Sequence, residues 1–321
     1  MPLSVDIVVV AYNRYTVTDS CLRHLQAQTV PHRLIVVDNG SSDDTRARLR
    51  AEWPAADLIC LDHNRGYPKA CNLGVASGSG DVVVLVNNDV DCRADMLEHL
   101  IAPLEDPSIG SVASLMLWPG GQKIDNLGLT ADPTLACFPR LHGLPTARVH
   151  DVSPVLVGPA GTVAAYRRAA WEQVGGFDET IISYDDDFDL ALRLRTAGWG
   201  TAKAPNAVGI HLGSTTHGYR STSQRYDNGF GRGYTLRRYG LPGGWLTLRT
   251  LATEALTVVG DAVISRDLAA LRGRVTGWRE GRVHGPLPRP PAEAIDWHIG
   301  FRDSLARRYV SVSSARSGRS A

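Results

Sequence analysis

Short β-branched runs alternate with helix-like segments over the first hundred residues of the chain. Residues 6–11, 34–37 and 82–86 are rich in Val and Leu or Ile, and each run ends in polar residues. Such continuous apolar runs are typical of strands buried on both faces, and the stretches 17–28 and 43–52 between them have helical spacing. The pattern predicts an α/β fold with a doubly wound, mostly parallel sheet, in which ligands bind beyond the carboxyl ends of the strands.

The second half of the chain has a different pattern. Residues 119–160 are rich in Gly and Pro and predict an irregular excursion over the sheet, of the kind that often shapes a pocket. Strand-like character returns at 163–166, and after about Gly240 apolar helical stretches are interspersed with Arg. We therefore expect a first domain over residues 1–240, a helical region over 241–310 and a disordered tail over 311–321.

The composition of the 321-residue chain is that of an ordinary globular protein, with 43% hydrophobic and 21% charged residues. Its formal net charge is +1 and no basic stretch is interleaved with aromatic residues, so nucleic acid is not an expected partner. The five Cys are scattered without CxxC spacing, which argues against a disulfide framework or a structural zinc site. A reducing cytoplasm fits this cysteine usage best.

The sequence predicts neither an export signal nor a membrane span. The most apolar later stretch, 251–264, is interrupted by Glu254 and Asp261. Residues 266–289 hold six Arg against two acidic residues, and helices of this kind can lie on the inner face of the plasma membrane. A plainer explanation is that Arg replaces Lys throughout this chain, which has only three Lys. Peripheral membrane contact and a homodimer both stay open.

An acidic cluster precedes an apolar helical run at residues 183–199. Four carboxylates fall within five positions, namely those of Asp185, Asp186, Asp187 and Asp189. Their mutual repulsion is costly unless a cation, a helix N-terminus or a catalytic proton offsets it. A solvated acidic cap on a helix that begins near Phe188 is the plainer interpretation.

Polar residues follow the first two predicted strands at the same edge of the sheet. Asp38 stands directly after the second strand, where an unpaired carboxylate can accept a hydrogen bond from a ligand N–H group. Uracil, thymine and guanine offer such a donor, whereas cytosine does not. Together with Asp38, four residues at the first strand end could hold one nucleotide: Ala11, Tyr12, Asn13 and Arg14. Alternatively, Asp38 only forms a turn before the next helix.

The segment DHNRGYPKACNLG contains a cluster of hydrogen-bond donors around a glycine that permits close backbone approach. Such chemistry suits a diphosphate or a ribose. The residues concerned are Asn64, Arg65, Gly66, Lys69 and Asn72. The alternative is a turn and a helix with ordinary surface cations.

Two residues in different parts of the chain are candidate metal ligands. Asp89 follows the third buried run, in the sequence NNDVD, and a hard divalent cation that bridges two phosphates needs one or two carboxylates. His211 follows the strand-like AVGI, and imidazole suits Mn²⁺ in sites with mixed N and O ligands. His217 is a weaker candidate, and a lone His is more often a structural hydrogen-bond partner.

These motifs, in this order, resemble the glycosyltransferase family 2 enzymes of GT-A fold, especially the bacterial rhamnosyltransferase-like branch. The resemblance runs from about Val5 to about Tyr239. The strand motifs read VDIVVVAYNR and LIVVDNGSSDDT, the nucleotide-and-phosphate loop reads HNRGYPKACNLGVASGSGD, and the element equivalent to DxD reads LVNNDVD. The acceptor-side stretch reads GGFDETIISYDDDFDLALRLRTAGW, with Asp186 and Asp187 at the family's Glu-Asp pair. APNAVGIHLGST resembles the downstream metal-ligand His motif.

The resemblance implies inverting, single-displacement transfer of a sugar from a nucleotide diphosphate to an acceptor hydroxyl. It implies Asp187 as general base, with Asp186 next, and a divalent cation, Mg²⁺ or Mn²⁺, held by Asp89 and His211. The implied donor is a dTDP- or UDP-sugar such as dTDP-rhamnose, and the acceptor is a glycan, a polyprenyl-linked glycan or a small natural product. Asn87 and Asn88, in the DxD element, are counted with the nucleotide-sugar site.

Two departures from the family pattern matter. The DxD element begins with the amide Asn87, which loosens the expected metal dependence, and the acidic pair is Asp-Asp instead of Glu-Asp. Asn87 and Asn88 favour an alternative, a catalytically silent nucleotide-sugar or glycan-binding protein, which slow donor hydrolysis would exclude. A sugar-phosphate nucleotidyltransferase is a further alternative, but it would carry a glycine-rich loop after the first strand, which AYNRYTVTD lacks.

Overall fold

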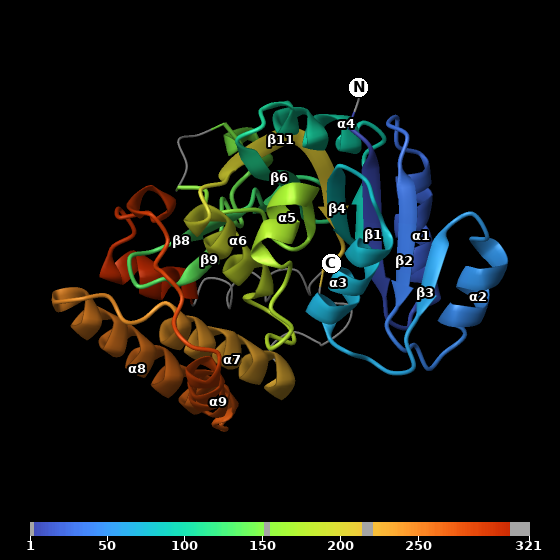
Figure 1. The fold of residues 1–321 in the computed structure, drawn as a ribbon. Coiled ribbons are helices and arrows are strands. Elements are labelled where there is room, and N and C mark those ends of the chain that lie inside the picture. Colours follow the sequence, from blue (N-terminus) through green and yellow to red (C-terminus); the bar gives the residue numbers. More distant parts are fainter. Residues whose placement is uncertain (1–2, 151–154, 214–220, 309–321) are drawn as a thin grey trace.

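The computed structural model describes residues 3–150, 155–213 and 221–308, so the expected tail and His217 lie outside the described residues. A nine-stranded sheet forms the centre of the described chain, with helices on both faces (Figure 1). Its first four strands are parallel and are connected through helices, as expected for an α/β fold. In spatial order they are β3 (Asp57–Cys60), β2 (Arg33–Asp38), β1 (Val5–Ala11) and β4 (Val82–Asn87).

The second half of the sheet is mixed. Strand β10 (Val163–Arg167) runs antiparallel to both of its neighbours, β4 and β6 (Ile109–Leu117), and β6 pairs in parallel with β11 (Gly200–His211). Short strands complete the edge and the excursion: β5 (Val90–Cys92), β7 (Ile124–Asn126), β8 (Leu129–Ala131) and β9 (Cys137–Pro139). The four strands predicted from apolar runs are confirmed as β1, β2, β4 and β10.

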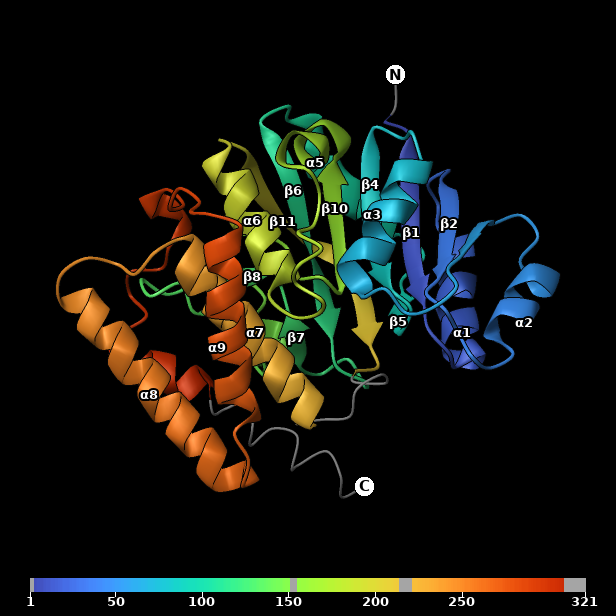
Figure 2. The same ribbon diagram turned by 60° about the horizontal axis from the view of Figure 1, so that its bottom comes forward.

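Helices cover both faces of the sheet and build a separate layer beyond its edge (Figure 2). Those beside the sheet are α1 (Tyr15–Gln26), α2 (Thr45–Glu52), α3 (Tyr67–Ser77), α4 (Met96–Ile101), α5 (Arg168–Val174) and α6 (Asp186–Thr196). The outer layer contains α7 (Thr222–Arg238), α8 (Trp245–Ser265) and α9 (Ala269–Val283). In the described part of the chain, no helix is long and apolar enough to cross a membrane.

The uninterrupted Val and Ile run of β1 is explained by a core on each side of the sheet. Ile7 and Val9 pack with residues of α1 and α4 on one face, and Val8 and Val10 pack with residues of α3 and α6 on the other. Because side chains alternate along a strand, a strand covered on both faces has apolar residues at every position. This double cover holds the polar strand ends in fixed positions at the carboxyl edge.

Helices α7 and α9 pack so closely that glycine is required along their contact. A Cβ atom at Gly273 would lie 2.0 Å from the backbone oxygen of Tyr226, and one at Gly277 would lie 2.0 Å from that of Phe230. Neither of these two oxygens can move away without bending α7, because both belong to the backbone of that helix.

We expect Gly277→Ala to destabilise the protein by about 2 kcal/mol, because the overpacked contact outweighs the better helix propensity of Ala. Gly243→Ala is the matched control, since a Cβ at Gly243 meets no atom within 4 Å. Urea unfolding followed by circular dichroism measures both changes. An equal effect of the two substitutions would show that the close contact is not what makes Gly277 necessary.

Candidate active site

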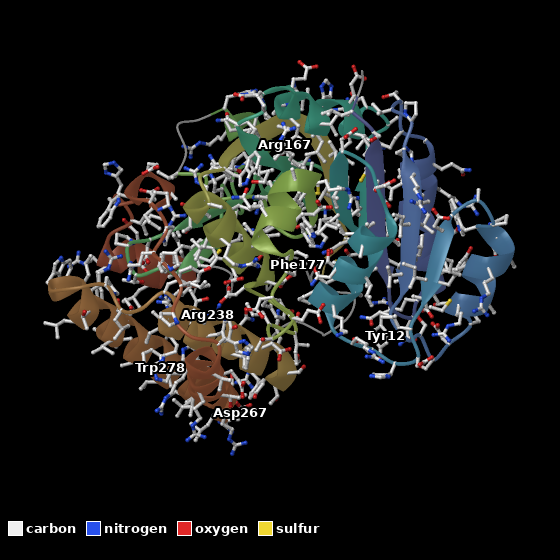
Figure 3. The ribbon with its side chains drawn as sticks, in the orientation of Figure 1. Tyr12, Arg167, Phe177, Arg238, Asp267 and Trp278 are labelled. Atoms are coloured by element: carbon white, nitrogen blue, oxygen red, sulfur yellow. The ribbon has the colours of Figure 1, made fainter. Side chains whose placement is uncertain are left out.

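A cleft of about 560 Å³ opens at the carboxyl ends of the parallel strands. Its walls come from the ends of β1 and β4, strand β7, residues 160–162, the loop at 182–185, the start of α6, His211 and part of α7. Tyr12, which follows β1, marks this lower edge of the sheet in Figure 3. The location agrees with the general expectation for open α/β sheets.

The acidic cluster sits on a strained turn that leads into α6. Tyr184 and Asp185 both have φ of 62°, a left-handed conformation that residues other than glycine rarely adopt. The turn presents Asp187 so that its Oδ2 accepts the N–H of Gly161 at 2.7 Å, while its Oδ1 accepts the N–H of Phe188 at 2.8 Å. Two backbone donors from different elements therefore fix the orientation of this carboxylate.

The crowded carboxylates are harder to ionise than ordinary aspartates. Burial, helped by the charge of Asp187, raises the pKa of Asp185 to about 7. Burial and the same neighbouring charge raise the pKa of Asp186 well above its ordinary value. Burial also raises the pKa of Asp187, against the opposing hydrogen bonds from the Gly161 and Phe188 N–H groups. A carboxylate with a raised pKa is a better proton acceptor when it is ionised.

On the other side of the cleft, Asp89 and His211 form a pair. The Nε2 atom of His211 lies 3.6 Å from Oδ1 of Asp89, and its Nδ1 lies 2.9 Å from Oδ2 of Asp125. Burial disfavours the protonated imidazole, but the hydrogen bonds and charges of Asp125 and Asp89 outweigh it and raise the pKa of His211 to about 10. The Asp125 contact orients the ring so that Nε2 points to Asp89.

This pair fits a divalent cation that also binds a diphosphate, with the cation replacing the proton that His211 otherwise carries on Nε2. Two ligands bonded at about 2.2 Å in one coordination shell lie about 3 to 3.6 Å apart, which matches the Asp89–His211 separation. No group of three His, Cys, Asp or Glu side chains that could hold a metal occurs in the described ranges. The remaining coordination positions would therefore belong to phosphate oxygens and water.

The charge of the cleft supports the same conclusion. Six Asp side chains line it, those of Asp89, Asp125, Asp185, Asp186, Asp187 and Asp227, and three of these ionise less readily than usual; none of the lining residues is Lys or Arg, and His211 is the one basic side chain in this lining. An anionic diphosphate alone would be repelled from such a surface. A divalent cation at Asp89 and His211 would reverse that repulsion at the point where the diphosphate must lie.

Asp89 and Asp187, predicted from separate motifs, line one cleft. Nine of the predicted site residues line it: Tyr12, Asn64, Gly66, Asn87, Asn88, Asp89, Asp186, Asp187 and His211. Seven others are not part of its lining: Ala11, Asn13, Arg14, Asp38, Arg65, Lys69 and Asn72. For each of these seven the role in binding remains a prediction, and several have other contacts in the structure.

Asp38 is not the unpaired carboxylate that the sequence predicted. It is fully buried, its Oδ2 accepts a hydrogen bond from Nε of Arg46 at 2.6 Å, and its Oδ1 accepts the N–H of Ser41 at 3.2 Å. The neighbouring Asn39 lines the cleft instead. Arg46 lies eight residues further along the chain, as the second residue of α2, and the sequence carries no local signal for this pairing.

The first-strand residues shape the turn next to the cleft. Ala11 is fully buried, and its backbone oxygen accepts the N–H of Asn39. Asn13 and Arg14 are left-handed, and their N–H groups bind Ser41 and Asp43. These bonds, together with the one from the Ser42 N–H to Oδ1 of Asn13, join the two strand ends.

Lys69 and Asn72, predicted to bind a diphosphate or a ribose, have contacts within the protein. Nζ of Lys69 lies 2.8 Å from Glu179, and the Asn72 amide binds the backbone of Phe177 and the Glu179 carboxylate. The backbone N–H of Arg65 binds Asn39. These contacts attach α3 and its preceding loop to residues 177–179, ahead of the acidic turn.

Sequence reasoning missed Asp125 and Gly161. Asp125 lies in the irregular excursion, where no periodic pattern marks it, and only the fold brings it to His211. Gly161 acts through its backbone N–H on Asp187, and a backbone donor has no sequence signature of its own. The turn-forming composition of residues 158–161 is the only available signal.

Comparison with known proteins places this site in a family. The sequence profile described as "Glycosyl transferase family 2" matches residues 6–175, and that of "Glycosyl transferase family group 2" matches residues 142–270. The chain belongs to glycosyltransferase family 2. The first profile includes the cleft residues up to Thr162, and the second includes the acidic turn and His211.

Two curated relatives of this family 2 member are rhamnosyltransferases. The N-acetylglucosaminyl-diphospho-decaprenol L-rhamnosyltransferase of Mycobacterium tuberculosis is 28% identical over 204 residues, which span 56% of this chain and 66% of that protein. The O-antigen chain rhamnosyltransferase RfbN of Salmonella typhimurium is 27% identical over 239 residues, 70% of each chain. The chain is thus rhamnosyltransferase-like, and the matched part is just under two thirds of the mycobacterial protein.

Solved structures confirm the expected GT-A fold. A mannosyltransferase from Pyrobaculum calidifontis, in complex with GDP-Man and Mn²⁺, has a TM-score of 0.55 and 19% identity, and the match covers 100% of this chain and 82% of that one. GalNAc-T7 with UDP, GalNAc and Mn²⁺ has a TM-score of 0.59 and 10% identity, with 99% and 58% covered. At these identities the likeness shows the fold.

Proposed function

We propose that this protein is an inverting glycosyltransferase that moves a sugar from a nucleotide diphosphate sugar to a hydroxyl group of a glycan or a lipid-linked glycan. The observation that carries the proposal is the shared cleft, in which Asp187 faces the same space as the Asp89–His211 pair. A base and a diphosphate site on one crevice are what an in-line displacement requires.

In this proposal Asp187 performs the proton transfer. Its carboxylate takes the proton of the acceptor hydroxyl while that oxygen forms a bond to the anomeric carbon of the donor sugar. The bond from this carbon to the diphosphate oxygen breaks, and its electron pair leaves with the nucleoside diphosphate. Attack opposite the leaving group inverts the anomeric carbon. Asp186, beside the base, is the second candidate for the same role.

Asp89 and His211 are the residues that would hold a divalent cation, with Asp125 orienting His211. When bound, the cation supplies charge stabilisation for the departing diphosphate. Two solved structures with the same fold contain Mn²⁺ by their descriptions, which supports a divalent cation here without deciding between Mn²⁺ and Mg²⁺.

The donor and the acceptor are assigned by likeness to the relatives. Both rhamnosyltransferases named above favour an activated rhamnose such as dTDP-rhamnose, and the mycobacterial enzyme by its name acts on a decaprenol-linked acceptor. We place the nucleotide beside Tyr12, Asn39 and Asn64, which line the cleft near the ends of β1 and β2.

A thermal-shift screen of nucleotide sugars tests this function. With Mn²⁺ present, we expect one dTDP- or UDP-sugar at about 100 times its Kd to raise the Tm by roughly 5 °C. The same donor should then release nucleoside diphosphate during incubation with the protein. If no donor shifts the Tm and none is hydrolysed or transferred, the proposal is wrong. A shift without any turnover would favour a silent binding protein.

A further inference from the structure

Helix α8 turns polar side chains toward the protein and apolar side chains toward solvent. Arg249, Thr250 and Thr253 are its buried residues. The three threonine hydroxyls at 250, 253 and 257 bind backbone oxygens one turn earlier in the same helix. A surface helix of a globular protein normally has the opposite arrangement. The reversal therefore needs a physical explanation on each side of the helix.

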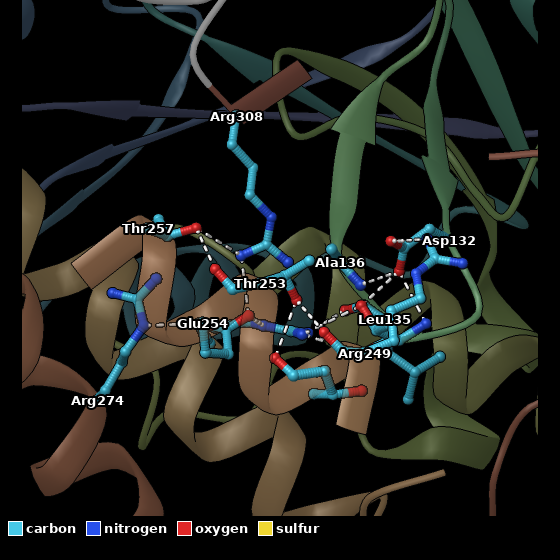
Figure 4. Close-up of polar contacts among 12 residues, drawn as sticks. Asp132, Leu135, Ala136, Arg249, Thr253, Glu254, Thr257, Arg274 and Arg308 are labelled. Atoms are coloured by element: carbon cyan, nitrogen blue, oxygen red, sulfur yellow. Dashed lines mark hydrogen bonds and ion pairs between the residues drawn. The ribbon is translucent and has the colours of Figure 1, made fainter. Parts of the chain in front are cut away.

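On the inner side, the explanation is an ion network. Glu254 accepts hydrogen bonds from Arg232 of α7 at 2.8 Å, Arg274 of α9 at 2.9 Å and Arg308 at 2.8 Å (Figure 4). Burial opposes ionisation of Glu254, but the three Arg residues outweigh it and hold the pKa of Glu254 well below its usual range. Arg249 adds an ion pair with the buried Asp132 at 3.0 Å. The ion pairs on the polar face of α8 thus attach the helix to the rest of the protein.

The outer side of α8 is a continuous apolar stripe. Trp245 is 66% exposed, Leu248 69%, Val259 60% and Val263 71%. Their spacing follows the helical repeat of 3.6 residues, and exposed Leu251, Ala252, Ala255 and Leu256 lie between them. Helix α8 forms the outer margin of the molecule, away from the sheet, in both ribbon views (Figures 1 and 2).

Helix α9 extends the apolar surface. The exposed N-cap residue Leu268 and the exposed helix residues Leu271, Val275 and Trp278 are three or four positions apart, on the side of α9 away from the glycines that contact α7. Trp278 lies on the outer helical layer in Figure 3. We call the exposed apolar residues of α8 and α9 together the α8–α9 outer face. Most of the exposed large hydrophobic side chains in the described ranges belong to it.

The charges that border this face are positive. Arg266, Arg272, Arg279 and Arg282 are exposed, whereas Asp261 and Asp267 are both engaged by Arg225 of α7. Glu254 is engaged by its three Arg partners, and both Glu254 and Glu280 are partly buried. The fully exposed charged residues of α8, of α9 and of the turn that joins them are therefore all Arg.

We propose that the α8–α9 outer face docks on the surface of a lipid bilayer that contains anionic headgroups. Apolar side chains with Trp among them, bordered by Arg, are complementary to the boundary between acyl chains and anionic headgroups. A second copy of the chain fits less well. Two-fold pairing would bring the Arg border of one copy against the same Arg border of the other, where Asp261 and Asp267 are already engaged by Arg225 and Glu280 is only partly exposed.

The face lies one helix layer away from the cleft. Asp227 and Asn228 of α7 line the cleft, and α7 packs directly against α9 through the glycine contact. A docked molecule would thus present its cleft within a short distance of the headgroups. This consequence, which rests on the proposed function, favours acceptors that are linked to a lipid.

Vesicle co-sedimentation of the full chain tests the proposal. At about 50 mM NaCl we expect binding to phosphatidylglycerol–phosphatidylcholine vesicles at least tenfold tighter than to phosphatidylcholine vesicles, and at least tenfold weaker at about 500 mM NaCl. The triple variant Leu248→Ser, Val259→Ser, Val263→Ser should weaken binding at least tenfold, whereas the exposed control Leu73→Ser on α3 should not. Arg272→Gln with Arg279→Gln should remove much of the salt dependence, unlike Arg50→Gln on α2.

Two results would overturn the docking proposal. One is equal sedimentation of the wild type and the triple variant with anionic vesicles. The other is the absence of vesicle binding together with a dimer, seen by sedimentation velocity, that the triple variant dissociates. Circular dichroism of each variant checks that the variant is folded. Because sedimentation needs neither donor nor turnover, failure of the transferase proposal leaves this test unaffected.

Discussion

Asp187→Asn should lower sugar transfer by about a thousandfold while donor affinity changes less than threefold. Asn keeps the size and the acceptor oxygen of Asp187, so it can retain one of the two backbone hydrogen bonds, from Gly161 or Phe188, that position the side chain. It cannot take the proton of the acceptor hydroxyl. The loss should therefore appear in kcat, measured as release of nucleoside diphosphate with acceptor present, and calorimetry should show the unchanged donor affinity.

Asp186→Asn is the matched comparison for this experiment. Asp186 is the adjacent residue and is buried at the same helix start, but the Gly161 N–H binds the side chain of Asp187 and not that of Asp186. We expect a smaller loss of transfer, about tenfold, because removing a neighbouring carboxylate changes the pKa of the base without removing it. Near wild-type transfer by Asp187→Asn, with a large loss in Asp186→Asn, would exchange the two assignments.

The same base assignment sets the direction of the pH profile. Burial raises the pKa of Asp187, so the ionised form that accepts a proton is lost at a higher pH than for an exposed aspartate. Transfer should thus fall as the pH is lowered through this raised value. In Asp187→Asn the residual rate should lose that acidic limb, whereas a merely structural role for Asp187 would leave it in place.

The sequence predicts the parts of this protein that depend on local pattern. The strands β1, β2, β4 and β10 follow from apolar runs, because a strand covered on both faces leaves a continuous signal. Strand β3 has only four residues and β6 contains several small residues, so neither stands out in the same way. Fold class and the common edge of the strand ends are predictable on this basis.

The sequence predicts those site residues that can be recognised without knowing their partner from another segment. Asp89, Asp187 and His211 each stand at an element boundary with a recognisable neighbourhood, and the fold brings them to one cleft. The pairing of Asp38 was not predicted because its partner Arg46 comes from the next helix, and Asp125 was missed because it contacts His211 from the distant strand β7. Pairings between distant segments are properties of the tertiary structure, which a single sequence does not display.

Asp89→Ala should lower transfer by about two to three orders of magnitude and raise the Mn²⁺ concentration needed for half-maximal activity at least tenfold. The reason is the charge of the cleft, where Asp89 and His211 are the residues placed to bring a cation between the diphosphate and the surrounding carboxylates. Without Asp89, only His211 and the phosphate oxygens would hold the ion. Mn²⁺ titration of activity and of the electron paramagnetic resonance signal in the presence of nucleoside diphosphate measures both effects.

Asp91→Ala is the matched control, two residues away on strand β5. Its carboxylate faces α1, where Oδ1 accepts a hydrogen bond from Ser20 at 3.0 Å, and it is not part of the cleft lining. It should leave the Mn²⁺ dependence unchanged. Asp125→Asn should give an intermediate effect, because it keeps the His211 ligand but weakens the bond that orients it. An unchanged Mn²⁺ requirement in Asp89→Ala would mean that Asp89 does not hold the cation. The diphosphate could then enter the negative cleft only if some of the lining aspartates were protonated.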